Sequence, residues 1–422
     1  MTAPKIFAID YGTSNTLLGA ADTKTTYTKV PIDPASESSH ILKSIIFSRG
    51  ADDWHFGTGA VNKYLEQPTM GRLFKSLKKF LPDPAFKGTQ ISGQFFTIQD
   101  LIAKLLRFLR DQANEHLSSN VDQVVMGHPA LFSSNPEQHE LALNRLRAAA
   151  IAAGFKEISF CPEPVAAAYH FRHKLDREKL VLVADFGGGT SDFTVVKMSA
   201  SRFQADDVLA IGGISRAGDH YDSAIMYHLI SPFFGSKITY RKPMTSNEMS
   251  FPKGLIRKIS SPADIVFLNR SGVMNELKAA RRYITKPEES FKLDQLIFLI
   301  EEFLGYAIFK KIEETKVELT TTDNSKFYFN NEPINIELEV SVEDFEAATH
   351  ENSEKILACL DDVIAKAQIK PQDIDIVCLT GGTASVPAIR RGLEQRFAEK
   401  VSESARFQSV VQGLTERAQE II

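Results

Sequence analysis

Residues 180–196 constrain the fold of this chain more than any other stretch. An apolar run ends in Asp185, three glycines follow, and the chain turns apolar again after Thr190 and Asp192. This order predicts a β-hairpin whose glycine tip leaves room for a ligand. Backbone N–H groups at such a tip can hold phosphate oxygens, and a carboxylate at the end of a buried strand needs a cation or another partner. The stretch therefore favours a site for phosphate and metal.

A second copy of the pattern lies near the N-terminus. Residues 5–10 form an apolar run that ends in Asp10, residues 11–15 supply a Gly-Thr turn, and residues 16–20 are apolar again. One such hairpin is equally typical of an ordinary turn, in which glycine and aspartate serve the backbone alone. Two copies instead predict a duplicated architecture with a nucleotide between the halves.

Composition narrows the possible functions. At 422 residues the chain exceeds one ordinary core, which indicates about two to four folding units. The 43% hydrophobic and 24% charged residues are typical of a globular protein, and the formal net charge of −4 argues against nucleic-acid binding. No run is apolar enough to cross a membrane, and the three cysteines have no paired spacing. We therefore expect a cytoplasmic protein with no signal peptide and no membrane or nucleic-acid partner.

The apolar runs predict an α/β fold. Short runs typical of strands buried on both faces recur at residues 5–9, 121–126, 180–184 and 374–379. A helix is expected from Pro136, after an N-cap at Asn135, to Gly154. Two more helices are expected, over residues 100–116 and from Ser341 onwards.

Two stretches interrupt this alternation. Residues 34–96 are expected to be irregular, and residues 214–339 mainly helical with polar loops near 239–250 and 320–331. We interpret both as subdomains inserted into two lobes, which would comprise residues 1–175 and 176–422.

Five further stretches carry a resemblance to a known family. They are Val-Met-Gly-His-Pro-Ala-Leu-Phe (125–132), Cys-Pro-Glu-Pro-Val-Ala-Ala-Ala-Tyr (161–169), Arg-Ala-Gly-Asp-His-Tyr-Asp (216–222), Glu-Glu-Thr-Lys-Val-Glu-Leu-Thr (313–320) and Thr-Gly-Gly-Thr-Ala-Ser-Val-Pro (380–387). With the hairpins, and in this order, they resemble the ATPase domain of the DnaK-type heat-shock protein 70 family. The resemblance implies the actin-like ATPase fold, with duplicated ribonuclease-H-like halves around a nucleotide cleft. The YegD-like chaperones are the nearest match, since they resemble the ATPase half alone, and we expect no peptide-binding domain to follow.

The resemblance also implies ATP or ADP and Mg²⁺ as cofactors. Asp10 and Asp185 would hold Mg²⁺ mostly through water, with Asp192 in support, and turn capping is their alternative role. The residues implied for the phosphates are Gly12, Thr13, Ser14 and Asn15 in one hairpin and Gly187, Gly188, Gly189 and Thr190 in the other.

Four residues are implied as catalytic, and they are Lys78, Glu163, Asp185 and Thr190. Lys78 matches the family's lysine that contacts the phosphates and the attacking water, although a solvated basic face is an alternative because other lysines are close by. Glu163 would orient water or the cation. Its alternative role is an acidic residue in the first turn of a helix.

For the nucleoside, the resemblance points to Gly218, Asp219, Glu313, Lys316, Thr320, Gly381, Gly382, Thr383 and Ser385. The family holds adenine between two arginines, and the matching positions here are Val317 and Ser385. Each lost stacking contact is worth about 1 kcal/mol, so ATP binding should be weaker by about tenfold or more.

We expect a slow, Mg²⁺-dependent ATPase that resembles the nucleotide-binding half of heat-shock chaperones and acts through protein partners. A small-molecule kinase of the same fold is one alternative, although such enzymes usually place an aspartate base near the acceptor hydroxyl. A nucleotide-binding or filament-forming actin-like protein without hydrolysis is the other. The fold alone does not decide between these functions.

Overall fold

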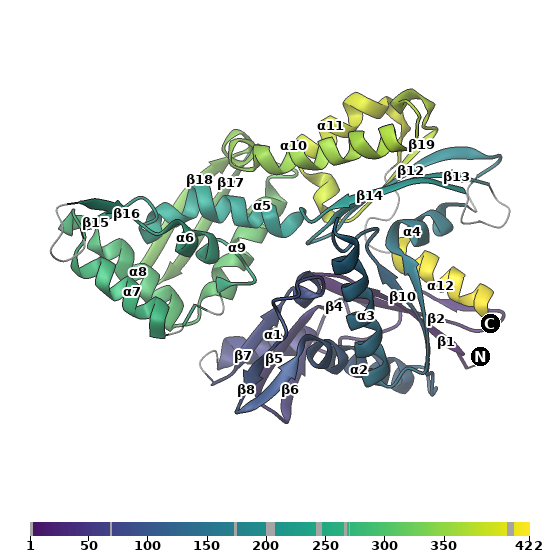
Figure 1. Cartoon of the computed structure of the whole chain (residues 1–422), viewed down its shortest axis with the longest axis horizontal. Coiled ribbons are helices and arrows are strands. Elements are labelled where there is room, and N and C mark those ends of the chain that lie inside the picture. Colours follow the sequence, from purple (N-terminus) through teal and green to yellow (C-terminus); the bar gives the residue numbers. More distant parts are fainter. Residues whose placement is uncertain are drawn as a thin grey trace. The chain divides into compact units, whose positions relative to one another are not determined.

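A computed structural model of the chain describes residues 3–67, 70–172, 175–199, 207–241, 247–265, 268–269, 271–402 and 409–422. The chain forms two compact units (Figure 1). Unit 1 consists of Met1–Ala217, Glu354–Ser385 and Ile389–Ile422, and unit 2 of Gly218–Ser353 and Val386–Ala388. Among the helices of the described residues, none is both long and apolar enough to cross a membrane.

The two largest β-sheets of the described residues lie in unit 1. The strands of the first are β1 (Ile6–Tyr11), β2 (Asn15–Ala21), β3 (Thr26–Tyr27), β4 (Leu42–Lys43), β10 (Gln123–His128) and β11 (Glu157–Pro162). Those of the second are β12 (Lys179–Phe186), β13 (Ser191–Met198), β14 (Val208–Ile214), β19 (Ile376–Thr380) and β20 (Val401–Ser402). The first sheet has the order β11-β10-β1-β2-β3, with β4 paired to β2, and the second has the order β14-β13-β12-β19-β20.

The two sheets share one topology. Each central strand, β1 or β12, pairs antiparallel with the strand that follows it and parallel with a later one, β10 or β19. The outer strands also pair in the same way in both sheets. The pairs β2/β3 and β13/β14 are antiparallel, and the pairs β10/β11 and β19/β20 are parallel. The predicted duplicated α/β architecture is confirmed.

Three helices lie where the sequence predicts them. They are α2 (Ile98–His116), α3 (Pro136–Ala153) and α10 (Val342–Lys366). The Asn135 side chain accepts a hydrogen bond at the start of α3, and Gly154 ends that helix with a φ of 100°. A positive φ is readily adopted by glycine, which is why the helix ends there.

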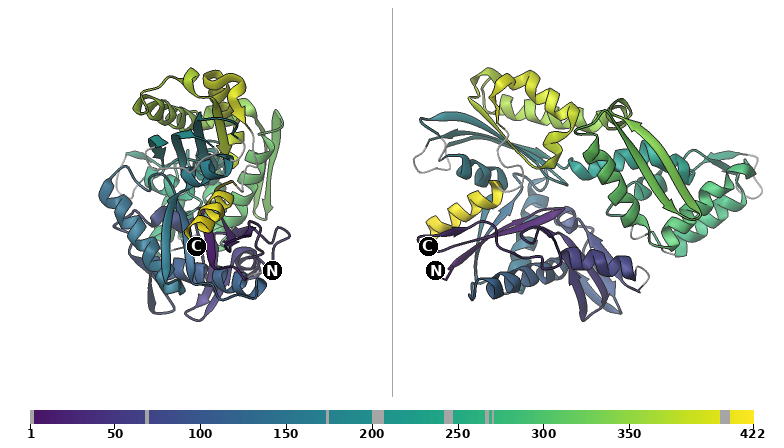
Figure 2. Two further views of the ribbon diagram at one scale, coloured as in Figure 1. Left: turned by 90° about the vertical axis from the view of Figure 1, so that its right-hand side faces the viewer. Right: turned by 180° about the vertical axis from the view of Figure 1, so that it is seen from behind.

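Two helices cross at close range in unit 1, α4 (Glu163–Phe171) and α12 (Ser409–Ile421) (Figures 1 and 2). At the crossing, the Cα of Gly413 lies against the backbone carbonyl of Ala166, so a side chain at position 413 would overlap with it. α12 also packs on β1, β2 and β10. The remaining long helix of this region, α11 (Pro387–Phe397), follows β19.

The stretch 34–96, predicted to be irregular, is instead ordered. It forms β5 (Ile45–Gly50), β6 (Asp53–Phe56), α1 (Gly57–Glu66), β7 (Arg72–Lys75), β8 (Gly88–Ile91) and most of β9 (Gln94–Thr97). Strands β6, β5 and β7 form one sheet, and β8 pairs with β9. The prediction was wrong because these strands contain at most three consecutive apolar residues, fewer than the runs at residues 5–9 and 180–184, so no strand pattern stands out.

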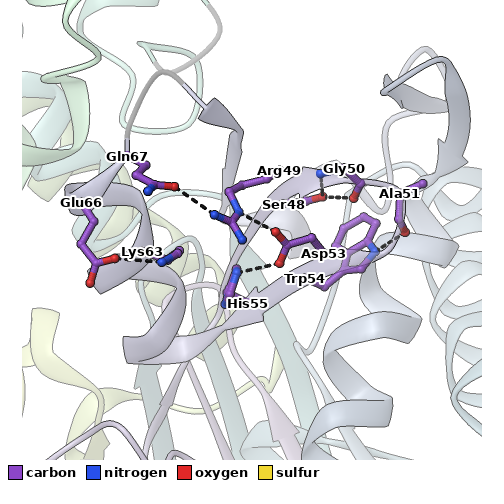
Figure 3. A network of polar contacts seen from close by, with 10 residues as sticks. All are labelled: Ser48, Arg49, Gly50, Ala51, Asp53, Trp54, His55, Lys63, Glu66 and Gln67. Carbon is purple, nitrogen blue, oxygen red and sulfur yellow. Dashed lines mark hydrogen bonds and ion pairs between the residues drawn. The ribbon is translucent and has the colours of Figure 1, made fainter.

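A polar network links β5 and β6 to the end of α1 (Figure 3). Asp53 Oδ2 accepts a hydrogen bond from Arg49 Nε at 2.5 Å, and Asp53 Oδ1 lies 2.8 Å from His55 Nε2. Arg49 Nη1 also donates to Gln67 Oε1 at 3.0 Å. Because partly exposed ion pairs contribute little to stability, this network fixes the local arrangement more than it stabilises the fold.

Unit 2 combines helices with β-hairpins. Its elements include the first part of α10 together with α5 (Gly218–Ile225), α6 (Lys253–Ile259), α7 (Ser271–Arg282), α8 (Ser290–Glu301), α9 (Gly305–Glu318), β15 (Thr239–Arg241), β16 (Glu248–Ser250), β17 (Asn324–Asn331) and β18 (Ile334–Ser341). The polar stretches that were predicted as loops contain strands, since β15 pairs with β16 and β17 pairs with β18. In β17, buried Phe327 and Phe329 alternate with exposed Lys326, Tyr328 and Asn330, so only one face of the strand is buried.

The α4–α12 crossing leads to a stability prediction. We expect Gly413→Ala to lower the free energy of unfolding by about 2–3 kcal/mol, because the added methyl group would force the two helices apart. Gly59→Ala in α1 is the matched control, since a Cβ there meets no atom within 4 Å. That change should be neutral or stabilise α1 by about 0.5–1 kcal/mol. Urea unfolding of the two variants measures the difference, and equal stabilities would contradict the prediction.

Candidate functional site

The two hairpins close with the same turn. In the first, the N–H of Gly12 donates to the carbonyl of Asn15 at 3.0 Å, and in the second the N–H of Gly187 donates to the carbonyl of Thr190 at 2.9 Å. In each hairpin an aspartate precedes that glycine by two residues, near the end of the strand. The duplication therefore extends from the sheets to the turns that carry the predicted site.

The tips of the two hairpins meet in unit 1. A Cβ on Gly188 would collide with Ser14 Oγ, and one on Gly189 would lie 2.9 Å from Thr13 Oγ1. A larger residue at either position would push the tips apart, so the contact depends on glycine. The structure thus brings together all the residues predicted for the phosphates, Gly12, Thr13, Ser14, Asn15, Gly187, Gly188, Gly189 and Thr190.

One lysine is buried in the same region. Lys78 lies on the short 3₁₀ helix η2 (Leu77–Phe80), and its Nζ donates to Glu163 Oε1 at 2.7 Å. The Lys78 side chain is 7% exposed, whereas the next residue, Lys79, is exposed to solvent. Burial lowers the pKa of Lys78, but the charges of Glu163 and Asp10 outweigh it and raise the pKa above its usual value. Lys78, and not Lys79, is therefore the lysine that lies beside the acidic residues.

The predicted metal ligands Asp10, Asp185 and Asp192 share this region with Glu163. Burial raises the pKa of Asp10 well above its usual value, the charge of Glu163 raises it further, and Lys78 opposes the effect. Burial also raises the pKa of Asp192, and the charges of Glu163 and Asp185 add to it. Four acidic side chains face one lysine, and a cation would neutralise the excess negative charge.

Asp185 receives one specific hydrogen bond from a neighbouring strand. Thr380 Oγ1, at the end of β19, donates to Asp185 Oδ1 at 2.5 Å. Burial and the charge of Glu163 nevertheless raise the pKa of Asp185 to about 6. The hydrogen bond therefore compensates only part of the cost of holding this carboxylate inside the protein.

The donor set fits a hydrated cation. Both carboxylate oxygens of Asp192 are buried, and neither has a hydrogen-bond partner of ordinary geometry. In the part of the chain that the structure describes, no three His, Cys, Asp or Glu side chains converge closely enough to hold an ion by themselves. Mg²⁺ keeps several waters and is bound through one or two carboxylates together with phosphate oxygens. These carboxylates therefore suit an Mg²⁺ ion that binds together with a nucleotide better than an ion that the protein holds by itself.

The turn after β19 packs against the second hairpin. Gly381 has a φ of 80°, and a Cβ at this position would overlap with the backbone of Phe186. Thr383 Oγ1 donates to the carbonyl of Gly187 at 3.2 Å. The predicted nucleoside residues that lie in this turn of unit 1 are Gly381, Gly382, Thr383 and Ser385.

The other predicted nucleoside residues lie in unit 2, on α5 and α9 or directly after α9. The Nζ of Lys316 lies 2.7 Å from Asp222 Oδ1 and 3.4 Å from the carbonyl of Gly218, which joins the two helices. Val317, at a position where the resemblance implies an arginine, is 58% exposed. The full set in this unit is Gly218, Asp219, Glu313, Lys316 and Thr320.

Two polar residues of the site were missed by the sequence reasoning. Ser44 Oγ donates to the carbonyl of Gly12 at 2.8 Å and supports the first hairpin. Thr380 directly precedes the Gly-Gly pair of a recognised motif, so parallel pairing of its strand with β12 would have placed it opposite Asp185. Ser44 is 32 residues from Gly12 and lies in a stretch without a motif, so no local signal indicated it.

Two sheets of one topology, each carrying an Asp–Gly hairpin whose tip meets the other, define the actin-like ATPase fold. The family model described as Hsp70 protein matches residues 73–252 and 303–412, which is more than half of the chain. The chain therefore belongs to the Hsp70 family. Both the family and the fold class inferred from the motifs are confirmed.

The chain is similar to bacterial chaperone proteins DnaK. That of Mycoplasma mobile is 24% identical over 419 residues, which cover 97% of this chain and 57% of the relative. That of Ureaplasma urealyticum is 24% identical over 97% of this chain and 57% of the relative, and that of Thermotoga petrophila is 22% identical over 94% and 56%. The chain thus spans a little over half the length of these relatives. The relatives that it matches are described as chaperone proteins.

The acidic cluster leads to a prediction for the protein without metal and nucleotide. The pKa of Asp185 is raised from 3.8 to about 6, so the charged carboxylate opposes folding above about pH 6 and ceases to do so as the pH falls below about 4. We expect Asp185→Asn to raise the free energy of unfolding by about 2–3 kcal/mol at pH 7.5 and by little at pH 4. Urea unfolding in EDTA across this pH range measures the gain.

Asp52→Asn is the control for this experiment, because Asp52 is exposed to solvent. It should change the stability by no more than a few tenths of a kcal/mol at either pH. The prediction fails if Asp185→Asn brings no gain at pH 7.5, or if its gain is the same at pH 4.

Proposed function

We propose that this chain binds ATP with Mg²⁺ and hydrolyses it slowly to ADP and phosphate. One observation carries the proposal, namely that two glycine hairpin tips, a buried Lys78–Glu163 pair, buried Asp185 and Asp192 and half-buried Asp10 converge in unit 1. Phosphoryl transfer depends on positioning and charge neutralisation more than on covalent chemistry. The turns offer N–H groups to phosphate, the ammonium offers a positive charge, and the carboxylates suit a cation.

Lys78 and Glu163 would position the attacking water. The raised pKa keeps Lys78 protonated, so its ammonium would donate to a phosphate oxygen or to water and would not act as a base. Glu163 already accepts a charge-assisted hydrogen bond from that ammonium, and such bonds are short and directional. Thr190, whose hydroxyl stabilises the charged form of Asp192, would complete the catalytic set with Asp185.

Asp10, Asp185 and Asp192 would hold the cation, Asp10 and Asp185 mostly through water. Bound Mg²⁺ would neutralise the charge on the transferred phosphoryl group. The raised pKa values of these carboxylates describe the protein without that cation. Cation binding would therefore favour their charged forms and remove part of the electrostatic penalty of the site.

The nucleoside contacts are proposed from the resemblance. They are Gly218, Asp219, Glu313, Lys316 and Thr320 of unit 2 together with Gly381, Gly382, Thr383 and Ser385 of unit 1. Val317 and Ser385 lack the guanidinium groups that stack on adenine in the family, so we propose micromolar or weaker binding of ATP. A nanomolar dissociation constant would overturn this part of the proposal.

We further propose a chaperone-like role in the cytoplasm, exerted through protein partners. The chaperone relatives support this role, and the proposed organisation is two ATPase lobes, residues 1–175 and 176–422, each with an inserted subdomain. Within the described residues no membrane-spanning helix is present, and the net charge of −4 does not favour nucleic acid as a partner.

The first functional prediction concerns Lys78. We expect Lys78→Met to lower the rate of phosphate release from Mg·ATP by about 100-fold, because one positioned donor to the reacting groups is lost. Lys79→Met is the matched control, since the neighbouring lysine is exposed and should be dispensable. Single-turnover phosphate release at saturating ATP measures both rates. Equal rates in the two variants would remove Lys78 from the catalytic set.

The same assay separates the alternative functions. Formation of ADP only when sugars are added would favour a small-molecule kinase, and light scattering that depends on ATP would favour a filament. Phosphate release that survives Asp185→Ala unchanged would exclude hydrolysis at this site. Stimulation by an unfolded peptide would support the chaperone-like role.

Position 317 tests the proposed contact with the adenine base of ATP. We expect Val317→Arg to tighten ATP binding by about five- to tenfold, because one arginine stacked on adenine contributes about 1 kcal/mol. Val317 is 58% exposed on α9, so the larger side chain should not disturb the fold. Val317→Met, which adds length without charge, is the control. Calorimetric titration with ATP measures both affinities, and an equal effect of the two substitutions would contradict the stacking interpretation.

A further inference from the structure

A second buried cation lies beside the turn that carries Lys78. Arg145, on α3, is 8% exposed, and its Nη1 donates to three backbone carbonyls. The acceptors are the carbonyl oxygens of Phe80 at 3.2 Å, Leu81 at 2.9 Å and Asp83 at 2.8 Å. All three acceptors follow Lys78 by two to five residues along the chain.

These carbonyls belong to the end of η2 and the turn after it. The last carbonyls of a helix have no partner within the helix, and a basic side chain can satisfy them. At its other end η2 is preceded by Ser76, which is fully buried and has a φ of 58°, a conformation that a residue with a side chain adopts only under constraint. The short helix that carries Lys78 is therefore held from both sides by the surrounding structure.

A purely structural role would not require a charged residue here. The guanidinium keeps its charge at any ordinary pH, and burying a charge is costly unless it is well compensated. Within the described part of the chain, the hydrogen-bond partners of Arg145 are carbonyl groups alone. The N–H groups of Nη1 share the three carbonyls, so one edge of the planar guanidinium holds the backbone of this short segment.

We propose that Arg145 is a positioning residue for Lys78, and this inference rests on the proposed ATPase function. Arg145 holds the carbonyls of residues 80–83, these hold η2, and η2 places the Lys78 ammonium 2.7 Å from Glu163 Oε1. Arg145 itself does not touch the nucleotide. A displacement of about 1 Å in a reacting group can lower a rate by about 100-fold, so a loosened η2 would affect hydrolysis more than nucleotide binding.

Substitution of Arg145 tests this role. Arg145→Met keeps the aliphatic stem and removes the donors, and Arg145→Lys keeps a charge and some donors. Arg147→Met is the matched control, because Arg147 is an exposed arginine of the same helix that donates to the carbonyl of Ile158 at 3.2 Å. We expect Arg145→Met to lower single-turnover phosphate release by about 10- to 100-fold. The dissociation constant of Mg·ADP should change less than twofold, Arg145→Lys should restore part of the rate, and Arg147→Met should release phosphate at the wild-type rate.

A double-mutant cycle with Lys78→Met separates positioning from general destabilisation. If Arg145 acts through Lys78, Arg145→Met causes no further loss of the residual rate in the Lys78→Met background. The inference is overturned if the loss is the same in both backgrounds, if Arg147→Met has the same effect, or if the folded Arg145→Met variant keeps the wild-type rate. Should Arg145→Met fail to fold, Arg145→Lys is carried through the same cycle.

The phosphate-release rates distinguish the loss of the positioning role of Arg145 from the loss of the proposed ATPase function. If the wild-type protein and Lys78→Met release phosphate equally slowly, the ATPase proposal falls and the role of Arg145 falls with it. If Lys78→Met is impaired and both Arg145 variants are not, the ATPase proposal stands and only the positioning role is lost.

Discussion

Four carboxylates and one lysine share the centre of unit 1, and their balance of charge governs how the site must be built. Asp10, Asp185 and Asp192 all have raised pKa values, with burial as the largest cause. The Lys78–Glu163 pair compensates two of the charges. Removing one partner of a buried pair leaves an uncompensated charge, which is far more destabilising than the pair itself is stabilising. The other three carboxylates oppose folding when no cation is bound. Such a loss of stability is common at sites where activity requires it.

The duplicated topology is what forces these charges together. In each of these sheets an aspartate is the next-to-last residue of the central strand. The side chains of the two hairpin tips are small enough for the tips to touch. Gly188 and Gly189 lie so close to the first tip that a larger residue would have to displace the side chain of Ser14 or Thr13. The requirement for glycine and the burial of the aspartates are therefore two consequences of one packing arrangement.

The parts of the site that could be predicted from the sequence are those that depend on local turn chemistry. Asp185 and its glycines indicate their hairpin because strand, turn and strand follow one another directly. The contact between Lys78 and Glu163 joins residues 85 positions apart, and only the tertiary structure shows which of several lysines makes it. Arg145 belongs to a helix that is predicted from its two ends, but no local signal indicates the backbone carbonyls that this arginine binds. Short strands were missed for the same reason, since their pairing is decided by distant partners.

The phosphate end and the base end of the proposed site are constrained by different kinds of structure. At the phosphate end, the proposed groups are backbone N–H groups, glycines in close contact and aspartates near strand ends, so a larger residue in place of Gly188 or Gly189 would disturb the contact between the two hairpins. At the base end, Val317 is 58% exposed on a helix surface, and the fold does not depend on its side chain. A stacking arginine can therefore be lost from such a position without a cost in stability. The absence of arginine at this position therefore bears on the proposed binding of adenine and not on folding, whereas the hairpins serve both folding and the proposed binding of phosphate.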